Sequence, residues 1–313
     1  MRKPYIVTKV FTLSNITKMS GEQQAAEGLP LRNVRWELMD LFLPEVGFWM
    51  AERGVDEISR EELLHLISDR RMEPVPEWHW TVYPLTKDRN TMPFIREMSV
   101  ERILEELEAQ MKLLVMVEDG VYGFCDPDYL SYFAGLGLNY RLVHAAKLFE
   151  EMKEVSDEAK KAELVHQIVE KLGDLESRLW SKDILQHCGC QFEIPRSCPK
   201  EMDDGWIQDK TWVPEFDTVM DLFRRVPENP VMAEILEKRS CGHRKTRYYA
   251  EQNLGTMLRQ CRMKGVLVDF TGIDFHGIDL THVDLSETVF GRKREGKAWY
   301  ANLENTGFES VWN

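Results

Sequence analysis

The chain has 313 residues, of which 43% are hydrophobic and 30% charged, and its formal net charge is −13. This composition is that of a folded protein of two or three domains, and it excludes an intrinsically disordered chain. The negative charge argues against nucleic acid as a partner of the whole chain. No apolar run is long enough to span a membrane, and six irregularly spaced cysteines favour reduced thiols in the cytoplasm over a disulfide framework.

Residues 1–77 are predicted to form a helical domain. Apolar residues recur at helical spacing over 34–54, where Pro44 either separates two helices or kinks one. Gly54 is placed to end this segment. The stretch SREE at 59–62 has the spacing of a capping box and therefore predicts the start of another helix.

Residues 78–136 are predicted to form a winged-helix-like module. Ser99 has the residue type and position to cap a helix. Two apolar runs follow that helix and flank Asp119-Gly120, a dipeptide that favours a type I′ hairpin turn. A helix followed by a small hairpin is the ending of a winged-helix module.

Residues 137–263 are predicted to form a second helical region. Within it, Ser156 is placed to cap a helix that Gly173 would end. The helical rhythm stops at 188–215, which is predicted to be an irregular loop, and returns before the C-terminal segment.

The cysteine-rich loop contains the one group of residues that resembles a metal site. Cys188, Cys190 and Cys198, together with Cys241 or His243, are residue types that bind zinc in tetrahedral sites. However, C-x-C spacing is less typical of zinc sites than C-x-x-C, and the two halves lie far apart in sequence. Unligated thiols are therefore favoured, and no bound metal is expected.

Residues 264–313 contain a repeat with a period of five. In VDFTGIDFHGIDLTHVDLSETVFG, an aspartate recurs at every fifth position and a Phe or Leu follows each one. This period fits neither an α-helix nor a single strand. The pattern resembles the pentapeptide-repeat family, which implies a right-handed four-sided β-helix with 20 residues in each coil and with the Phe and Leu residues inside. The aspartates are Asp269, Asp274, Asp279 and Asp284, and the inward residues are Phe270, Phe275, Leu280, Leu285 and Phe290.

The repeat is interrupted and then resumes. Residues 291–299 break the period, and we expect them to form an excursion from the coil, after which Leu303 takes the next inward position. The excursion is basic. One interpretation is that the charged residues are simply solvated. The four aspartates of one coil would lie on four different faces, which counts against a single-sided acidic surface. The alternative is a partner-binding surface formed by the aspartates together with Arg292, Lys293 and Arg294.

The N-terminal half shows a second resemblance. Its order of motifs is a proline in KPYIVTKV at 3–10, a helix, a hairpin that ends near Phe124, and a helix that contains Tyr132, Phe133 and Ala134. This order resembles the region that follows the nucleotide-binding core of bacterial NACHT-type STAND NTPases. These proteins are signal-transduction ATPases that often end in repeat domains.

The resemblance implies that Pro4 and Asp126 occupy positions near a bound nucleotide. The family has a histidine where this chain has Asp126, and a carboxylate does not usefully contact a phosphate without a metal between them. The chain has no G-x-x-x-x-G-K-[ST] motif, so ATP is expected only through an NTPase domain that this chain lacks, and no cofactor is expected in the chain itself. It also has no G-x-S-x-G or H-E-x-x-H signature, so we expect no enzymatic activity.

Together these observations predict a mainly α protein with a winged-helix-like α/β module and a short C-terminal β-helix at 264–313. The leading hypothesis is a regulatory and sensor segment of a STAND-type NTPase, which implies roles such as bacterial signalling or antiviral defence. Its partner would be another protein or its own NTPase domain, and oligomerisation is left open. The alternative hypothesis is a stand-alone pentapeptide-repeat interaction protein with a helical cap.

Overall fold

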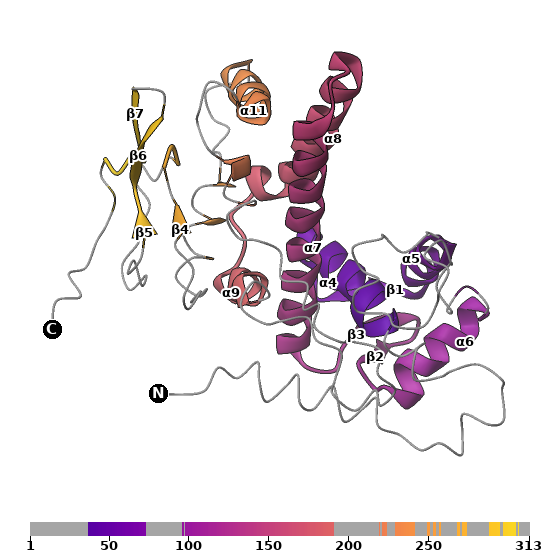
Figure 1. Ribbon diagram of the computed structural model, residues 1–313. Helices are drawn as coiled ribbons and strands as arrows, with labels where there is room; N and C mark the ends of the chain where they lie inside the picture. Colours follow the sequence, from indigo (N-terminus) through magenta and orange to yellow (C-terminus); the bar gives the residue numbers. More distant parts are fainter. Residues whose placement is uncertain are drawn as a thin grey trace, which may run out of the picture. The chain divides into compact units, whose positions relative to one another are not determined.

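The computed structural model shows a mainly helical protein with a small three-stranded antiparallel sheet (Figure 1). The chain divides into two compact units, with the division between Gly137 and Leu138. None of the helices in the described part of the chain is long and apolar enough to cross a membrane. The structure describes residues 37–72, 96, 98–190, 219, 221–223, 229–241, 249–250, 253–254, 257, 268–269, 271–273, 288–294, 297–304 and 306.

The described part of unit 1 starts with a helix that changes type between Phe42 and Leu43. The π-helical turn η1 (Leu38–Phe42) leads into α4 (Leu43–Arg53), and the Leu43 N–H donates to the Leu38 carbonyl. Pro44 lies in the first turn of α4, directly after the π-helical turn. Gly54 ends α4 with a φ of 66°, as predicted, because glycine adopts this left-handed conformation without strain.

Both predicted serine caps of unit 1 are present. Strand β1 (Glu57–Ser59) leads into α5 (Arg60–Met72), where Ser59 Oγ accepts a hydrogen bond from the Glu62 N–H (3.2 Å) and a Glu62 carboxylate oxygen accepts from the Ser59 N–H (3.3 Å). This is the reciprocal pair of a capping box. Helix α6 (Val100–Glu105) starts at Ser99, whose Oγ accepts from the Arg102 N–H (3.1 Å). The π-helical turn η4 (Glu106–Gln110) follows directly.

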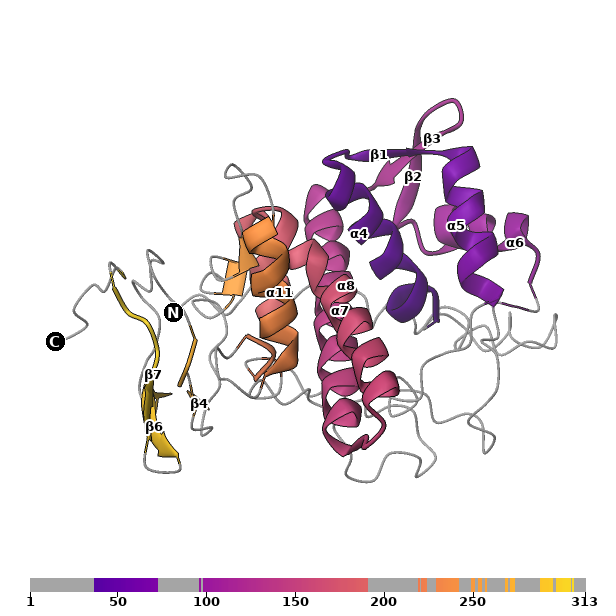
Figure 2. The same ribbon diagram turned by 90° about the horizontal axis from the view of Figure 1, so that it is seen from above.

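A β-hairpin follows η4 and completes the sheet of unit 1. Strands β2 (Leu114–Glu118) and β3 (Val121–Phe124) pair antiparallel, and β1 pairs with the other edge of β3, giving the order β1-β3-β2 (Figure 2). Gly120 has a positive φ but Asp119 does not, so the predicted type I′ turn is wrong, because that turn requires both. A β-bulge lies between Met116 and Glu118, one residue before the turn.

The β1–β3 pairing joins residues on either side of the predicted boundary at 77/78. Residues Glu57, Ile58 and Ser59 pair with Gly123, Tyr122 and Val121, so the hairpin shares its sheet with a strand from the predicted helical domain. The helices pack on this sheet around one apolar core. Its fully buried members include Leu38, Leu43, Met50, Ile58, Leu63, Ile103, Leu107, Leu114 and Phe133.

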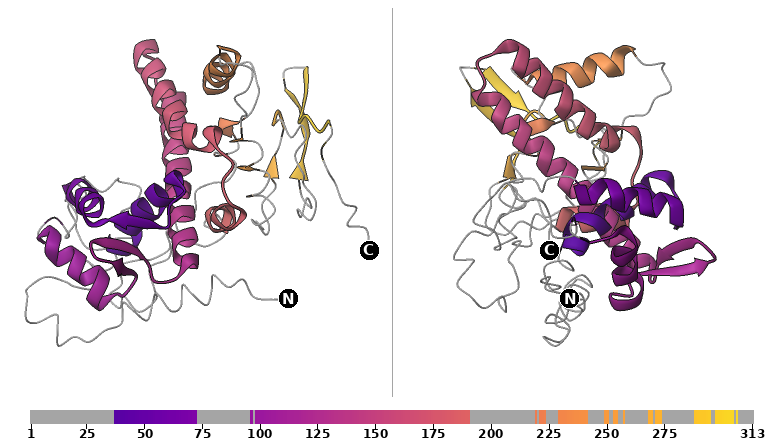
Figure 3. Two further views of the ribbon diagram at one scale, coloured as in Figure 1. Left: turned by 180° about the vertical axis from the view of Figure 1, so that it is seen from behind. Right: turned by 90° about the vertical axis from the view of Figure 1, so that its right-hand side faces the viewer.

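Helix α7 (Pro127–Glu154) belongs to both units, and α8 (Glu158–Ser177) lies beside its second half in unit 2 (Figure 3). An ion pair between Lys160 Nζ and Glu151 Oε1 (3.0 Å) joins them near the turn. The cap of α8 is Asp157, which accepts from the Ala159 N–H (3.0 Å), and the predicted cap at Ser156 is wrong. The helix also continues through Gly173 to Ser177, so the predicted end at this glycine is wrong too.

Two shorter helices complete the described helical part of unit 2. Helix α9 (Lys182–Cys190) includes Cys188, Gly189 and Cys190, which the sequence analysis assigned to the loop at 188–215. Helix α11 (Pro230–Cys241) begins at Asn229, whose side-chain oxygen accepts from the Val231 and Met232 N–H groups. The helices of unit 2, from the second half of α7 to α11, bury apolar residues that include Leu142, Val143, Phe149, Ile168, Leu172, Leu185, Val231 and Ile235.

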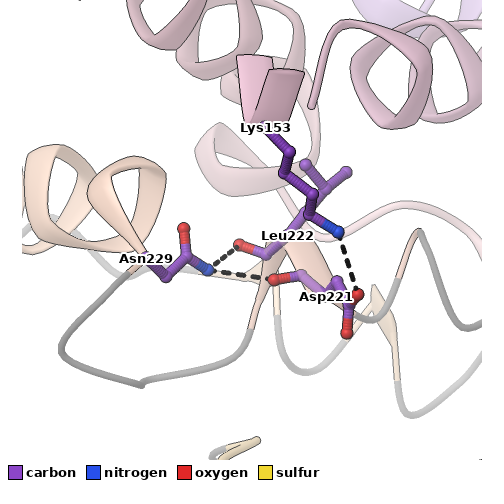
Figure 4. Close-up of polar contacts among 4 residues, drawn as sticks. All are labelled: Lys153, Asp221, Leu222 and Asn229. Carbon is purple, nitrogen blue, oxygen red and sulfur yellow. Dashed lines mark hydrogen bonds and ion pairs between the residues drawn. The ribbon is translucent and has the colours of Figure 1, made fainter. Parts of the chain in front are cut away.

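Three buried asparagines link separate segments of unit 2 through hydrogen bonds to backbone carbonyls. Asn139 Nδ2 donates to the Cys188 carbonyl (3.3 Å), which ties α7 to α9. Asn229 Nδ2 donates to the carbonyls of Asp221 (2.9 Å) and Leu222 (3.4 Å), and Lys153 Nζ reaches the Asp221 carboxylate at 3.4 Å (Figure 4). Asn253 makes the third link, at the end of α8.

The C-terminal part of unit 2 contains two small two-stranded sheets. Strands β4 (Val268–Asp269) and β5 (Thr288–Val289) are parallel, whereas β6 (Gly291–Arg294) and β7 (Lys297–Tyr300) form an antiparallel hairpin. No β-helix is evident among the described residues. Most of the repeat falls outside them, including the predicted inward residues Phe270, Phe275, Leu280 and Leu285.

Candidate functional site

The candidate recognition site is built around the five-residue repeat. Val268 pairs with Thr288, and Asp269 pairs with Val289, so each residue of β4 pairs with the residue 20 positions later. The chain turns directly after β4, where Thr271, Gly272 and Ile273 are buried. Gly272 has a φ of 79°, a conformation that other residues rarely adopt. The glycine therefore allows a sharp corner one residue before the next apolar position of the repeat.

The basic segment that interrupts the repeat forms the hairpin β6–β7. Its base is closed by the Ala301 N–H, which donates to the Phe290 carbonyl (2.7 Å). The Asn302 N–H then donates to the Ile273 carbonyl (2.8 Å), so the chain returns alongside the corner at 271–273. The hairpin therefore lies between residues 288–289, which pair with 268–269, and Asn302, which bonds to Ile273.

The register of the hairpin places a cation and an aromatic ring on one face. Lys293 pairs with Ala298, and Gly291 pairs with Tyr300. Residues that pair across a hairpin lie on the same face, and so do residues two positions apart along one strand. Lys293 and Tyr300 therefore share a face. Lys293 is exposed and Tyr300 is 70% exposed. Arg292 and Arg294 occupy the alternate register positions, and their side chains lie outside the described part of the structure.

The positions of the predicted acidic side chains relative to this basic face lie outside the described part of the chain. The backbone of Asp269 lies in β4, and its side chain is outside the described residues, as are Asp274, Asp279 and Asp284. The idea that these aspartates form a partner surface therefore stays a prediction. The described candidate surface consists of Lys293, Ala298 and Tyr300.

Of the two positions that the family resemblance places near a nucleotide, only Asp126 is described, and it lies at the start of α7. Asp126 Oδ1 accepts from the Asp128 N–H (2.9 Å), and the Tyr129 N–H donates to the Asp126 carbonyl (2.9 Å), so Asp126 caps α7. Pro127 takes the first helical position, which suits its fixed φ. An aspartate followed by proline is a sequence signal for a helix start, and it could have identified this role. Pro4 lies outside the described residues.

The aromatic residues that carry the resemblance form a cluster where the hairpin meets α7. The rings of Phe124 and Phe133 are stacked with centroids 5.5 Å apart, and Tyr132 meets Phe133 edge-on at 5.1 Å. Phe133 and Ala134 are fully buried. These residues therefore join the sheet to α7 within unit 1.

The candidate zinc ligands are not assembled in the part of the chain that can be examined. Cys188 is buried in α9, and Cys190 and Cys241 end α9 and α11, with side chains outside the described residues. Cys198 and His243 also lie outside them. Among the described residues, no group of three or more His, Cys, Asp or Glu could hold a metal ion.

Sequence reasoning missed two features with a bearing on function. The first is an exposed apolar pair, Met116 and Val117, on the edge strand β2. Two successive apolar residues in a predicted hairpin did not indicate exposure, because a strand normally buries one of the two. The second is the exposed Tyr300 of the basic hairpin, which no periodicity marked. Comparison with models of known protein families, with curated protein sequences and with solved structures found no match to this chain.

Proposed function

We propose that this chain is a non-catalytic regulatory and recognition segment of a STAND-type signalling NTPase, and that its C-terminal repeat forms the partner-binding part. The single observation that carries the recognition part is the register of β4 against β5. Support for the regulatory part comes from the order of elements in unit 1, together with the family resemblance of its motifs.

The β4–β5 register supports a coil of five-residue repeats. A four-sided coil of such repeats takes 20 residues, so each residue pairs in parallel with the residue 20 positions on. The pairs Val268–Thr288 and Asp269–Val289 have this register. Parallel strands usually need a crossover connection that contains a helix. Here the connection consists of the repeat itself, and a single turn of a β-helix is the simplest structure that brings these residues together.

The return of the chain after the hairpin supports a second coil. In a parallel ladder, the N–H that follows a paired residue donates to the carbonyl of its partner. The bond from the Asn302 N–H to the Ile273 carbonyl therefore aligns Ala301 with Ile273 and Leu303 with position 275. Ala301 and Ile273 are equivalent positions of the repeat. The hairpin β6–β7 is then an insertion in the second coil, and the coil continues after it.

The topology of unit 1 supports a winged-helix module. The chain order is α4, β1, α5, α6, β2 and β3, and the antiparallel sheet has the order β1-β3-β2. A winged-helix domain has this order, with the last hairpin as its wing. The module would then start at α4, well before residue 78. Fold alone does not define function, so the regulatory role rests on the family resemblance of the motifs around Phe124 and Phe133.

The test combines nucleotide binding with the gene context. We expect calorimetric titration of ATP into the isolated chain to show no binding, because the sequence has no phosphate loop. Micromolar affinity would contradict the non-catalytic role. A P-loop encoded in the same frame or by a neighbouring gene would support the NTPase assignment, and the ATPase rate of that protein should then change when this chain is added. Absence of such a gene would favour a stand-alone repeat protein.

A further inference from the structure

The outer edge of the sheet in unit 1 exposes apolar side chains. Strand β2 is an edge strand, and its Met116 and Val117 are 47% and 46% exposed. The bulge at this point lets both side chains reach solvent. A Cβ built on Gly123 would lie 3.3 Å from the Asp56 carbonyl oxygen and 3.5 Å from Val117 Cγ1, so the start of β1 lies close to Val117. Edge strands of this kind are templates for pairing with another chain.

Carboxylates follow this apolar pair along the same strand. Glu118 and Asp119 are both exposed, and Asp56 and Glu57, at the start of the opposite edge strand β1, are exposed as well. We call residues 116–119 the acidic edge. A second acidic edge cannot pair with it, because like charges facing each other across strands are destabilising. The charge therefore selects a partner strand that is basic.

The chain itself contains such a strand. The hairpin β6–β7 is a two-stranded sheet, and among the described residues its strands pair only with each other. Its sequence, GRKR followed by KAWY, is basic and aromatic. On one face it carries the exposed Lys293 and Tyr300, a cation and an apolar ring. Carboxylates beside exposed Met and Val side chains are the complement of this pair.

We propose that the basic hairpin of one copy of this chain docks on the acidic edge of a second copy. Lys293 faces the carboxylates at Glu118 and Asp119, while the ring of Tyr300 covers Met116 and Val117. The contact joins two different surfaces, so it is heterologous, and it builds either a closed ring or an open chain of copies. This inference does not depend on the proposed function, because it rests on the charge and exposure of two described strands.

The experiment is sedimentation velocity on the purified chain from about 1 to about 100 µM, where a concentration-dependent association raises the mean mass. We expect the mass to rise with concentration at low salt and to fall toward the monomer at about 1 M salt, where charges are screened within a few ångströms. Two charge-reversed variants provide the decisive comparison. One carries Lys293→Glu with Arg294→Glu, and the other carries Glu118→Lys with Asp119→Lys.

Each variant alone should remain monomeric, because both of its surfaces then carry the same sign of charge. An equimolar mixture should associate again, since the reversed hairpin fits the reversed edge and the two unchanged surfaces fit each other. Lys182→Glu, at an exposed position at the start of α9, serves as the control and should associate like the wild type. Far-ultraviolet circular dichroism checks that each variant is folded.

Two outcomes would overturn the proposal. One is a wild-type chain that stays monomeric over the whole concentration range. The other is a mixture of the reversed variants that does not associate although both are folded. If a reversed variant fails to fold, Tyr300→Ser replaces it, because this substitution changes no charge. It should then weaken association about tenfold, the effect of losing one buried aromatic contact, and unchanged association would again contradict the docking.

Discussion

At the scale of single residues, two glycines allow α4 and the start of α7 to touch backbone to backbone in unit 1. A Cβ on Gly137 would lie 2.5 Å from the Pro44 carbonyl oxygen and 2.9 Å from Phe48 Cβ. A Cβ on Gly47 would lie 2.8 Å from both the Ala134 nitrogen and Phe133 Cβ. Real Cβ atoms do not approach backbone atoms this closely, so any larger residue would force the two helices apart.

We therefore predict that Gly137→Ala lowers the free energy of unfolding by about 1–3 kcal/mol, the usual cost of overpacking. Gly173→Ala is the matched control, because Gly173 lies inside α8 and a Cβ there meets nothing within 4 Å. This second substitution should raise stability by about 0.5–1 kcal/mol through helix propensity. Urea unfolding of the three proteins measures both changes. Equal effects would show that the close helix contact is absent.

His144 is the residue whose titration should affect stability. It lies in α7, and burial, together with the positive charge of Lys171 on α8, lowers its pKa from 6.5 to about 4. The folded protein therefore holds a neutral imidazole at pH values where the unfolded chain is already protonated. The stabilising contribution is complete above pH 6.5 and is lost as the pH falls from 6.5 toward 4.

We predict that the stability difference between the wild type and His144→Gln changes across this window. The wild type should lose stability relative to the variant as the pH falls from 6.5 to 4, because only the wild type has this histidine to protonate on unfolding. Urea melts of both proteins at several pH values give the difference and cancel the other titrating groups. A difference that is independent of pH would rule out the lowered pKa.

At the scale of elements, the end of α8 is held by a residue far away in sequence. Asn253 is fully buried, its Nδ2 donates to the carbonyls of Leu175 and Arg178 (both 2.8 Å), and its Oδ1 accepts from the Trp180 N–H (3.1 Å). The last carbonyls of a helix have no partner inside the helix. The asparagine supplies that partner and also fixes the turn that leads toward α9.

We predict that Asn253→Leu lowers the free energy of unfolding by roughly 2–4 kcal/mol, since a leucine of similar size leaves buried backbone groups without hydrogen bonds. Gln167→Ala removes a side-chain hydrogen bond to Glu163 on the surface of α8 and serves as the control. This change should stay within about 0.5 kcal/mol. Thermal or urea unfolding distinguishes the two, and comparable losses would mean that the buried asparagine adds nothing beyond surface contacts.

At the scale of the whole molecule, the chain is two units that share α7, and the repeat belongs to unit 2. Ile273 is fully buried at the corner after β4. We predict that Ile273→Ala costs about 2–4 kcal/mol, as expected for truncating a buried aliphatic residue, whereas Asp269→Ala stays within about 1 kcal/mol. Hydrogen exchange should show faster exchange around 268–273 and 288–302 in the first variant, with β1 and β3 of unit 1 unchanged. Equal effects of the two substitutions would contradict the proposed coil.

The sequence by itself determined the features that depend on neighbours three or four residues away. The capping box at Ser59, the cap at Ser99 and the glycine end of α4 were all predicted, because each is made by a few consecutive residues. The 20-residue register of β4 against β5 agrees with the coil length that the resemblance to pentapeptide repeats implies. The end of α8 could not be predicted from the sequence, because the residue that holds it, Asn253, is distant in sequence.

Tertiary structure decided what long-range contacts control. The pairing of β1 with β3, the close approach of Gly47 and Gly137 to the helix opposite each of them, and the exposure of Met116 and Val117 each depend on segments that are far apart along the chain. Hydrophobic pattern and propensity carry no record of such partners, since burial is non-directional and only packing selects which surfaces meet. Local chemistry therefore specified the end of α4 and the starts of α5 and α6, whereas packing specified which faces of the elements remain exposed.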